Sequence, residues 1–124
     1  MMMSDAGNHR SARELRTEIS TALTLLDEPQ DWGIVNADSE RLDEFVAFLA
    51  AREFAATQVF DLVDLILASA NERLLEDPSA DLHAVEGALR QHPAAAAVHG
   101  DYWAALDDVR EFPLGAWIRG QRAG

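Results

Sequence analysis

Residues 57–76 read TQVFDLVDLILASANERLLE, and this stretch determines the predicted fold. Plotted at 100° per residue, the apolar side chains cover most of the circumference of a helix; they are Val59, Phe60, Leu62, Val63, Leu65, Ile66, Leu67, Ala70, Leu74 and Leu75. Only a narrow seam stays polar, and it holds Asp61, Asp64, Glu72 and Glu76. A helix that is apolar nearly all round is enclosed by other helices, whereas a surface helix has one apolar stripe. We therefore expect an all-α protein built around a central buried helix over about residues 57–76.

Two amphipathic helices are predicted before the central helix. The first begins at a capping box, in which the Ser11 hydroxyl and the Glu14 carboxylate each satisfy a free backbone amide. It should end before Pro29, because the residue before a proline disfavours helical geometry. Residues 28–38 contain proline, glycine and asparagine without a helical period, so we expect a loop there. A second helix should follow, from residue 38 or 39 to about residue 52.

Prolines divide the chain after the central helix, which Thr57 is expected to cap. Asp77 followed by Pro78 is a helix start signal, because proline is favoured at the first helical position. It predicts a helix from Pro78 to Gln91. Another helix should start at Pro93. Its expected inner face consists of Val98, Tyr102, Ala105, Leu106 and Val109. The final LGAWIRG segment suggests at most two helical turns.

No strand-like alternation runs longer than three or four residues, and no internal repeat is visible. The sequence therefore predicts a compact bundle of five to six helices. We expect residues 11–120 to form a single helical domain, with a flexible N-terminus over residues 1–10 and a flexible C-terminus over residues 121–124.

The composition is that of a globular protein in a reducing compartment. A chain of 124 residues suits one domain with one core, and 48% of its residues are apolar. The absence of cysteine excludes disulfides and thiolate metal sites. Residues 1–10 have neither the basic flank nor the apolar centre of a secretory signal, and no apolar run approaches the roughly 20 residues that span a bilayer. The expected location is the cytoplasm.

The charge is strongly acidic and unevenly distributed. The formal net charge is −12, with 22 acidic residues, 10 arginines and no lysine. Residues 27–111 hold 19 of the acids and only 5 of the arginines. A field of this sign opposes nucleic acids and anionic membranes, and it speeds the capture of basic partners. The alternative is that the acidic surface only keeps the protein soluble.

Motifs for nucleotide, metal and catalytic chemistry are missing from the sequence. It has no GxxxxGK[ST] loop and no GxGxxG, so nucleotide binding is not expected. His83 and Glu86 share a helix face, but a carboxylate-bridged metal pair would need a second such motif. His92, His99 and Asp101 are candidate acid–base groups without a nucleophile in a recognisable context. We expect no cofactor and no enzymatic activity.

Asp61 and Asp64 are the first candidates for partner binding. They lie three residues apart on the central helix and so share one face, where two carboxylates repel each other unless they are exposed or paired. One interpretation places them on the solvent-facing seam of the helix, and another pairs one of them with Arg41, Arg52 or Arg73. The functional interpretation makes them part of an acidic contact surface.

A second candidate group lies near residue 107. On a helix, Trp103, Asp107 and Glu111 would recur at four-residue spacing on one side, with Asp108 beside them. An aromatic side chain next to carboxylates is typical of interfaces with basic partners, although large aromatics are more often core residues. The loop that precedes the second helix holds a further candidate pair, Asp31 and Trp32.

Three hypotheses about function follow from these observations. The first is a small acidic inhibitor or immunity-type protein that neutralises a basic protein partner, such as a bacterial toxin or nuclease, by covering a site built for phosphate. The second is a regulatory or scaffolding helical module that self-associates as a homodimer or docks a helix from another protein. The third is an enzyme with a dispersed site, which predicts a pocket with convergent polar groups. The charge favours the first.

Overall fold

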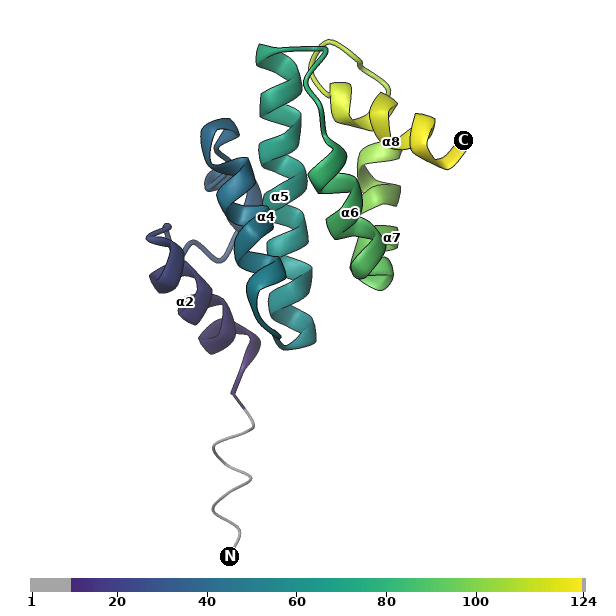
Figure 1. Cartoon of the computed structure of the whole chain (residues 1–124). Helices are drawn as coiled ribbons and strands as arrows, with labels where there is room; N and C mark the ends of the chain where they lie inside the picture. Colours follow the sequence, from purple (N-terminus) through teal and green to yellow (C-terminus); the bar gives the residue numbers. More distant parts are fainter. Residues whose placement is uncertain (1–9, 124) are drawn as a thin grey trace, which may run out of the picture.

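The computed structural model describes residues 10–123, and within that range all regular secondary structure is helical. The central element is α5 (Ala56–Glu76). On one side of it lie α2 (Ala12–Leu23) and α4 (Leu42–Ala51), and on the other lie α6 (His83–Gln91), α7 (Pro93–Ala104) and α8 (Pro113–Ala123) (Figure 1). The short α3 (Trp32–Val35) and the 3₁₀ helix η1 (Ser39–Arg41) complete the set. Helix α5 contacts every one of these elements, which confirms the predicted all-α bundle around a central helix.

Helix α5 is enclosed on all sides over its middle three turns. Every residue from 62 to 71 is buried except Asp64, which is half-buried. Leu62, Leu65 and Leu67 have no exposed surface at all. Burying one such side chain stabilises the fold by about 1.5–3 kcal/mol, so this stretch supplies much of the core. The all-round apolar pattern predicted this arrangement.

The starts of the first helices follow local hydrogen-bonding rules. The Ser11 and Glu14 capping box is present, with bonds of 3.1 Å and 2.8 Å between each side chain and the other residue's backbone N–H. Helix α5 begins one residue earlier than predicted, at Ala56. The Gln58 carboxamide accepts a bond from the Ala55 N–H, and Thr57 lies inside the first turn instead of capping it.

Helix α6 begins at His83 and not at Pro78, so the predicted helix start at Asp77 and Pro78 is wrong. The Asp77 carboxylate accepts bonds from the backbone N–H and the hydroxyl of Ser79, which fixes a turn at this point. The Asp81 carboxylate then accepts the His83 N–H and starts the helix. Short polar side chains compete with helix formation in this way by bonding their own backbone.

Two other features differ from the prediction, and one prediction is untested. Residues 28–38 are mostly irregular, as expected, but they include the single turn of α3. Helix α8 has 11 residues where at most two turns were predicted, and it makes residues 121–123 helical instead of loose. The predicted flexible N-terminus lies, apart from Arg10, outside the described residues.

Candidate partner-binding surface

The two tryptophans proposed as contact residues are both buried. Trp32 is 4% exposed and its indole Nε1 donates to the Ser20 hydroxyl oxygen at 2.8 Å. Trp103 is 5% exposed and packs edge-on against Phe112, with ring centroids 6.1 Å apart. Both are core residues, so neither can supply the exposed aromatic surface that an interface would need. Tyr102, which was expected to be buried, is 57% exposed.

The acidic residues after α7 lie on a loop and not on a helix. Helix α7 ends at Ala104, so the four-residue spacing that was expected to align Trp103, Asp107 and Glu111 does not apply. Asp107, Asp108 and Glu111 are all exposed. The Asp108 carboxylate accepts the backbone N–H of Arg110, an exposed cation within the same loop.

Asp61 and Asp64 are both half-buried on α5. They are therefore neither fully solvent-exposed, as one interpretation expected, nor paired internally with one of the arginines that the other interpretation named. The three arginines considered as partners are engaged elsewhere. Arg41 binds Glu44, Arg73 binds Asp43, and Arg52 stacks over the Phe48 ring. Desolvation raises the pKa of Asp61, and the nearby Arg16 guanidinium opposes that rise. No arginine within residues 10–123 forms an ion pair with Asp64.

Asp64 reaches from α5 to the start of α3. Its carboxylate lies against Gly33, where any Cβ atom would collide with it. Desolvation raises the pKa of Asp64; His99 lowers it, and the Asp31 carboxylate raises it further. Asp31 itself has φ of 55°, a left-handed conformation that few non-glycine residues adopt. The structure therefore brings Asp31 and Asp64 together, as two carboxylates that repel each other.

His99 on α7 completes this group. Its Nε2 lies 2.9 Å from the Phe60 carbonyl oxygen, and since a carbonyl only accepts, Nε2 carries a proton. Its Nδ1 lies 3.9 Å from the Asp64 carboxylate, too far for a hydrogen bond. The imidazole ring also packs against the Phe60 ring, with centroids 4.1 Å apart. When the ring is neutral, Nδ1 is an acceptor, and two acceptors face each other across the 3.9 Å gap; when the ring is protonated, Nδ1 is a donor and its charge lowers the pKa of Asp64.

These residues line a cleft of about 320 Å³ between α3, α5 and α7, which we call the Asp64 cleft. Its walls are formed by Asp31, Ile34, Asp64, Val98, His99 and Tyr102. Ile34, Val98 and Tyr102 are exposed, and Val98 also borders a neighbouring apolar hollow of about 480 Å³ next to Phe60. The cleft therefore combines carboxylates with an accessible apolar rim.

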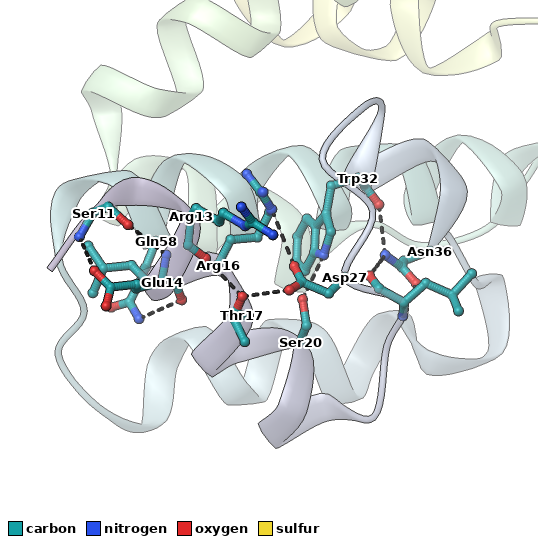
Figure 2. A network of polar contacts seen from close by, with 12 residues as sticks. Ser11, Arg13, Glu14, Arg16, Thr17, Ser20, Asp27, Trp32, Asn36 and Gln58 are labelled. Carbon is teal, nitrogen blue, oxygen red and sulfur yellow. Dashed lines mark hydrogen bonds and ion pairs between the residues drawn. The ribbon is translucent and has the colours of Figure 1, made fainter.

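Polar contacts hold the loop that carries Asp31 in place. Figure 2 shows the indole of Trp32 meeting Ser20 of α2, with Asn36 beside Trp32. The Asn36 side chain bonds both the N–H and the carbonyl of Leu26 and also the Trp32 carbonyl, at 2.9–3.0 Å. On α2, Arg16 pairs with Asp27 at 3.5 Å. The wall of the cleft formed by Asp31 and Ile34 is thus fixed to the body before any ligand arrives.

The other candidate groups do not converge. His83 and Glu86 lie 3.9 Å apart at the surface, and Glu86 also pairs with Arg90. Asp101 is bound to Arg122, and so is engaged away from His99. Residues 10–123 bring together no group of three or more histidine, cysteine, aspartate or glutamate side chains suited to a metal ion.

The sequence interpretation missed the role of His99 because it placed the wrong face of α7 inside. The buried residues are Ala95, His99, Gly100 and Trp103, and of these His99 and Trp103 lie one position after the predicted Val98 and Tyr102. One residue of error turns a helix by 100°. The four-residue spacing of Ala95, His99 and Trp103 indicates that they share one helix face. That face was not predicted to be buried, because a histidine lies in the middle of it.

Comparisons of the chain with protein-family models, with curated proteins and with solved structures give no match. In the part of the chain that the structure describes, no helix has both the length and the apolar character needed to cross a membrane.

Proposed function

We propose that this protein binds and neutralises a basic protein partner, in the manner of an inhibitor or immunity protein against a toxin or nuclease. The observation that carries the proposal is the Asp64 cleft. Asp31 and Asp64 stand next to exposed apolar side chains, and no arginine within residues 10–123 forms an ion pair with either. The half-buried Asp64 carboxylate and the exposed Asp31 carboxylate, beside apolar surface, match a partner that presents cations among apolar groups.

The alternative is a self-associating module, which the exposed apolar side chains of Phe60, Val98 and Tyr102 favour. The net charge opposes it, because two copies that each carry −12 repel one another. A basic partner removes that repulsion and gains attraction instead. The charge therefore favours a basic partner over self-association.

The proposal is tested by capture from the native host with tagged protein, at low and then moderate salt, with identification by mass spectrometry. The expected result is one dominant basic protein whose own activity falls in proportion to the added inhibitor, with full inhibition at equal molar amounts. Association should slow steeply as salt rises, since electrostatic steering is screened. Recovery of the tagged chain alone, with dimers in sedimentation equilibrium, would support the self-associating module instead.

A further inference from the structure

We propose that the Asp64 cleft receives one arginine side chain of the basic partner, with its guanidinium between Asp31, Asp64 and His99 and an adjacent apolar side chain on the rim. This inference rests on the proposed function and names the contact through which it acts. Four features of the cleft support it: its size, the charges around Asp64, the gap between the His99 ring and the Asp64 carboxylate, and the exposed apolar side chains at its opening.

The size of the cleft suits a single side chain. Its volume of about 320 Å³ is at the lower end of the roughly 300–1,000 Å³ typical of ligand pockets. The residues that line it come from α5, α7 and the α3 segment, and α3 is anchored by Trp32 and Asn36. The walls therefore do not need to be ordered on binding, which reduces the entropy cost of association.

The electrostatics call for a cation. Desolvation raises the pKa of Asp64, His99 opposes that rise, and repulsion from Asp31 raises the pKa further. The charges that face Asp64 are those of Asp31 on the α3 segment and of Asp61 on its own helix, with His99 opposite on α7. Arg16 on α2 acts on Asp61 and is paired with Asp27. A guanidinium in the cleft would relieve the repulsion between the carboxylates.

While His99 is neutral, the gap between its Nδ1 and the Asp64 carboxylate has room for a hydrogen-bond donor but contains none. Nε2 of His99 is committed to the Phe60 carbonyl, so the neutral ring offers only the Nδ1 lone pair toward Asp64. A donor nitrogen can sit about 2.9 Å from both acceptors, because they are 3.9 Å apart. Guanidinium has five N–H donors in a fixed plane, so one group can bridge both acceptors and also reach Asp31. An ammonium group has fewer donors and no plane to stack on a ring.

The rim calls for an apolar neighbour of the arginine. Ile34, Val98 and Tyr102 surround the opening and remain exposed in the free protein. Tyrosine supplies contact area at low entropy cost and also stacks on guanidinium planes. A leucine-type side chain beside the arginine would cover Val98 and its hollow next to Phe60.

The competing acidic group, Asp107, Asp108 and Glu111, has no comparable construction. All three carboxylates are exposed, and Arg110 lies among them. Exposed charges contribute to long-range attraction but little to short-range specificity. This group therefore provides a matched control, since Asp107→Asn with Asp108→Asn removes the same charge as Asp31→Asn with Asp64→Asn.

The test is an NMR titration of the isotopically labelled full chain with the capped tripeptide Leu-Arg-Leu. Its controls are the same peptide with neutral citrulline, and with lysine, in place of arginine. Shifts should concentrate at residues 31–35, 60–64 and 98–102. We expect at least a tenfold loss of affinity with citrulline, a several-fold loss with lysine, and at least a tenfold loss for the Asp31→Asn/Asp64→Asn variant. The Asp107→Asn/Asp108→Asn variant should bind within twofold of the wild type.

Equal binding of the arginine and citrulline peptides, or equal losses in the two double variants, would overturn the assignment of the cleft. So would the absence of any localised shift at saturating peptide. Capture from the host separates this result from the proposed function. A basic partner bound equally by the wild type and the Asp31→Asn/Asp64→Asn variant removes the cleft assignment and leaves the proposed function standing. Failure to capture any basic partner removes the proposed function, and the peptide titration then decides the cleft independently.

Discussion

Asp64 is the one residue between positions 62 and 71 that is not fully buried, and its carboxylate is held where burial penalises its charge. Its pKa in the folded protein is raised above the unfolded value, mainly by desolvation. The folded state therefore binds more protons than the unfolded state across the range from the ordinary carboxyl pKa up to the raised one. The free energy of unfolding falls as pH rises through that range, and the loss persists at neutral pH.

Asp64→Asn should consequently stabilise the protein at neutral pH by about 1 kcal/mol. This value is the lower end of the free-energy cost of burying a polar group whose interactions are poorly compensated, about 1 kcal/mol. The asparagine has nearly the same size and shape, so it fits the same space against Gly33. Urea unfolding between pH 4 and pH 7 should show a shallower fall in the free energy of unfolding than in the wild type. Asp107→Asn, at an exposed carboxylate, should change stability by less than about 0.5 kcal/mol. A less stable Asp64→Asn variant would show that the charge has a structural role.

Buried polar side chains fix the irregular segments to the helices, and none of them could be read from the sequence. The Asn71 carboxamide accepts the Leu114 N–H at 3.0 Å and donates to the Glu111 carbonyl at 3.2 Å, which ties the α7–α8 loop to α5. The Ser69 hydroxyl accepts the Asp38 N–H at 3.0 Å on another side of the same helix. In the sequence these residues look like breaks in an apolar pattern, because their partners lie more than 30 residues away.

At the scale of the helices, glycines set how closely α8 approaches α7. A Cβ atom at Gly115 would lie 2.5 Å and 2.6 Å from the carbonyl oxygens of Trp103 and Leu106. Both are backbone atoms that cannot rotate away. A Cβ at Gly87 on α6, in contrast, would have no atom within 4 Å.

Alanine substitutions at these two positions should therefore have opposite signs. Gly115→Ala should destabilise the protein by about 1–3 kcal/mol through overpacking. Gly87→Ala should stabilise it by about 1 kcal/mol, the difference in helix propensity between the two residues. Chemical denaturation of the two variants beside the wild type measures both. Equal effects would mean that α8 can shift away from the end of α7.

The elements that the sequence predicted best are those with the strongest periodicity. The central helix and the Ser11 capping box were recovered because their signals are local. The face of α7 was predicted one residue out of register, because the buried His99 depends on the Phe60 carbonyl, 39 residues away. Asp61 and Asp64 were identified as candidates from their three-residue spacing on the central helix, and Asp31 from its place beside Trp32. The assembly of Asp31 and Asp64 with His99 into one cleft, which Asp61 does not line, required the tertiary structure.

For the molecule as a whole, the charge of −12 implies a stability that depends on salt. Self-repulsion destabilises a compact state, and its range shrinks from about 30 Å at 0.01 M ionic strength to about 8 Å at 0.15 M. Raising salt between these values should stabilise the fold by about 1 kcal/mol, which raises Tm by about 4 °C. Circular dichroism during heating measures this. The same series near pH 4.5, the isoelectric point, should show no such gain.

Because α5 is enclosed, hydrogen exchange of its backbone amides should depend on whether a ligand occupies the Asp64 cleft. Amide protons in residues 62–71 sit under the surrounding helices, so they should exchange with solvent only when the whole molecule opens. Asp64 lies within that segment and also faces the cleft. A ligand held there lowers the population of the globally opened molecule by the factor 1 + [L]/Kd, so exchange that requires this opening slows by the same factor. The slowest-exchanging amides of the chain should therefore report directly on whether the cleft is filled.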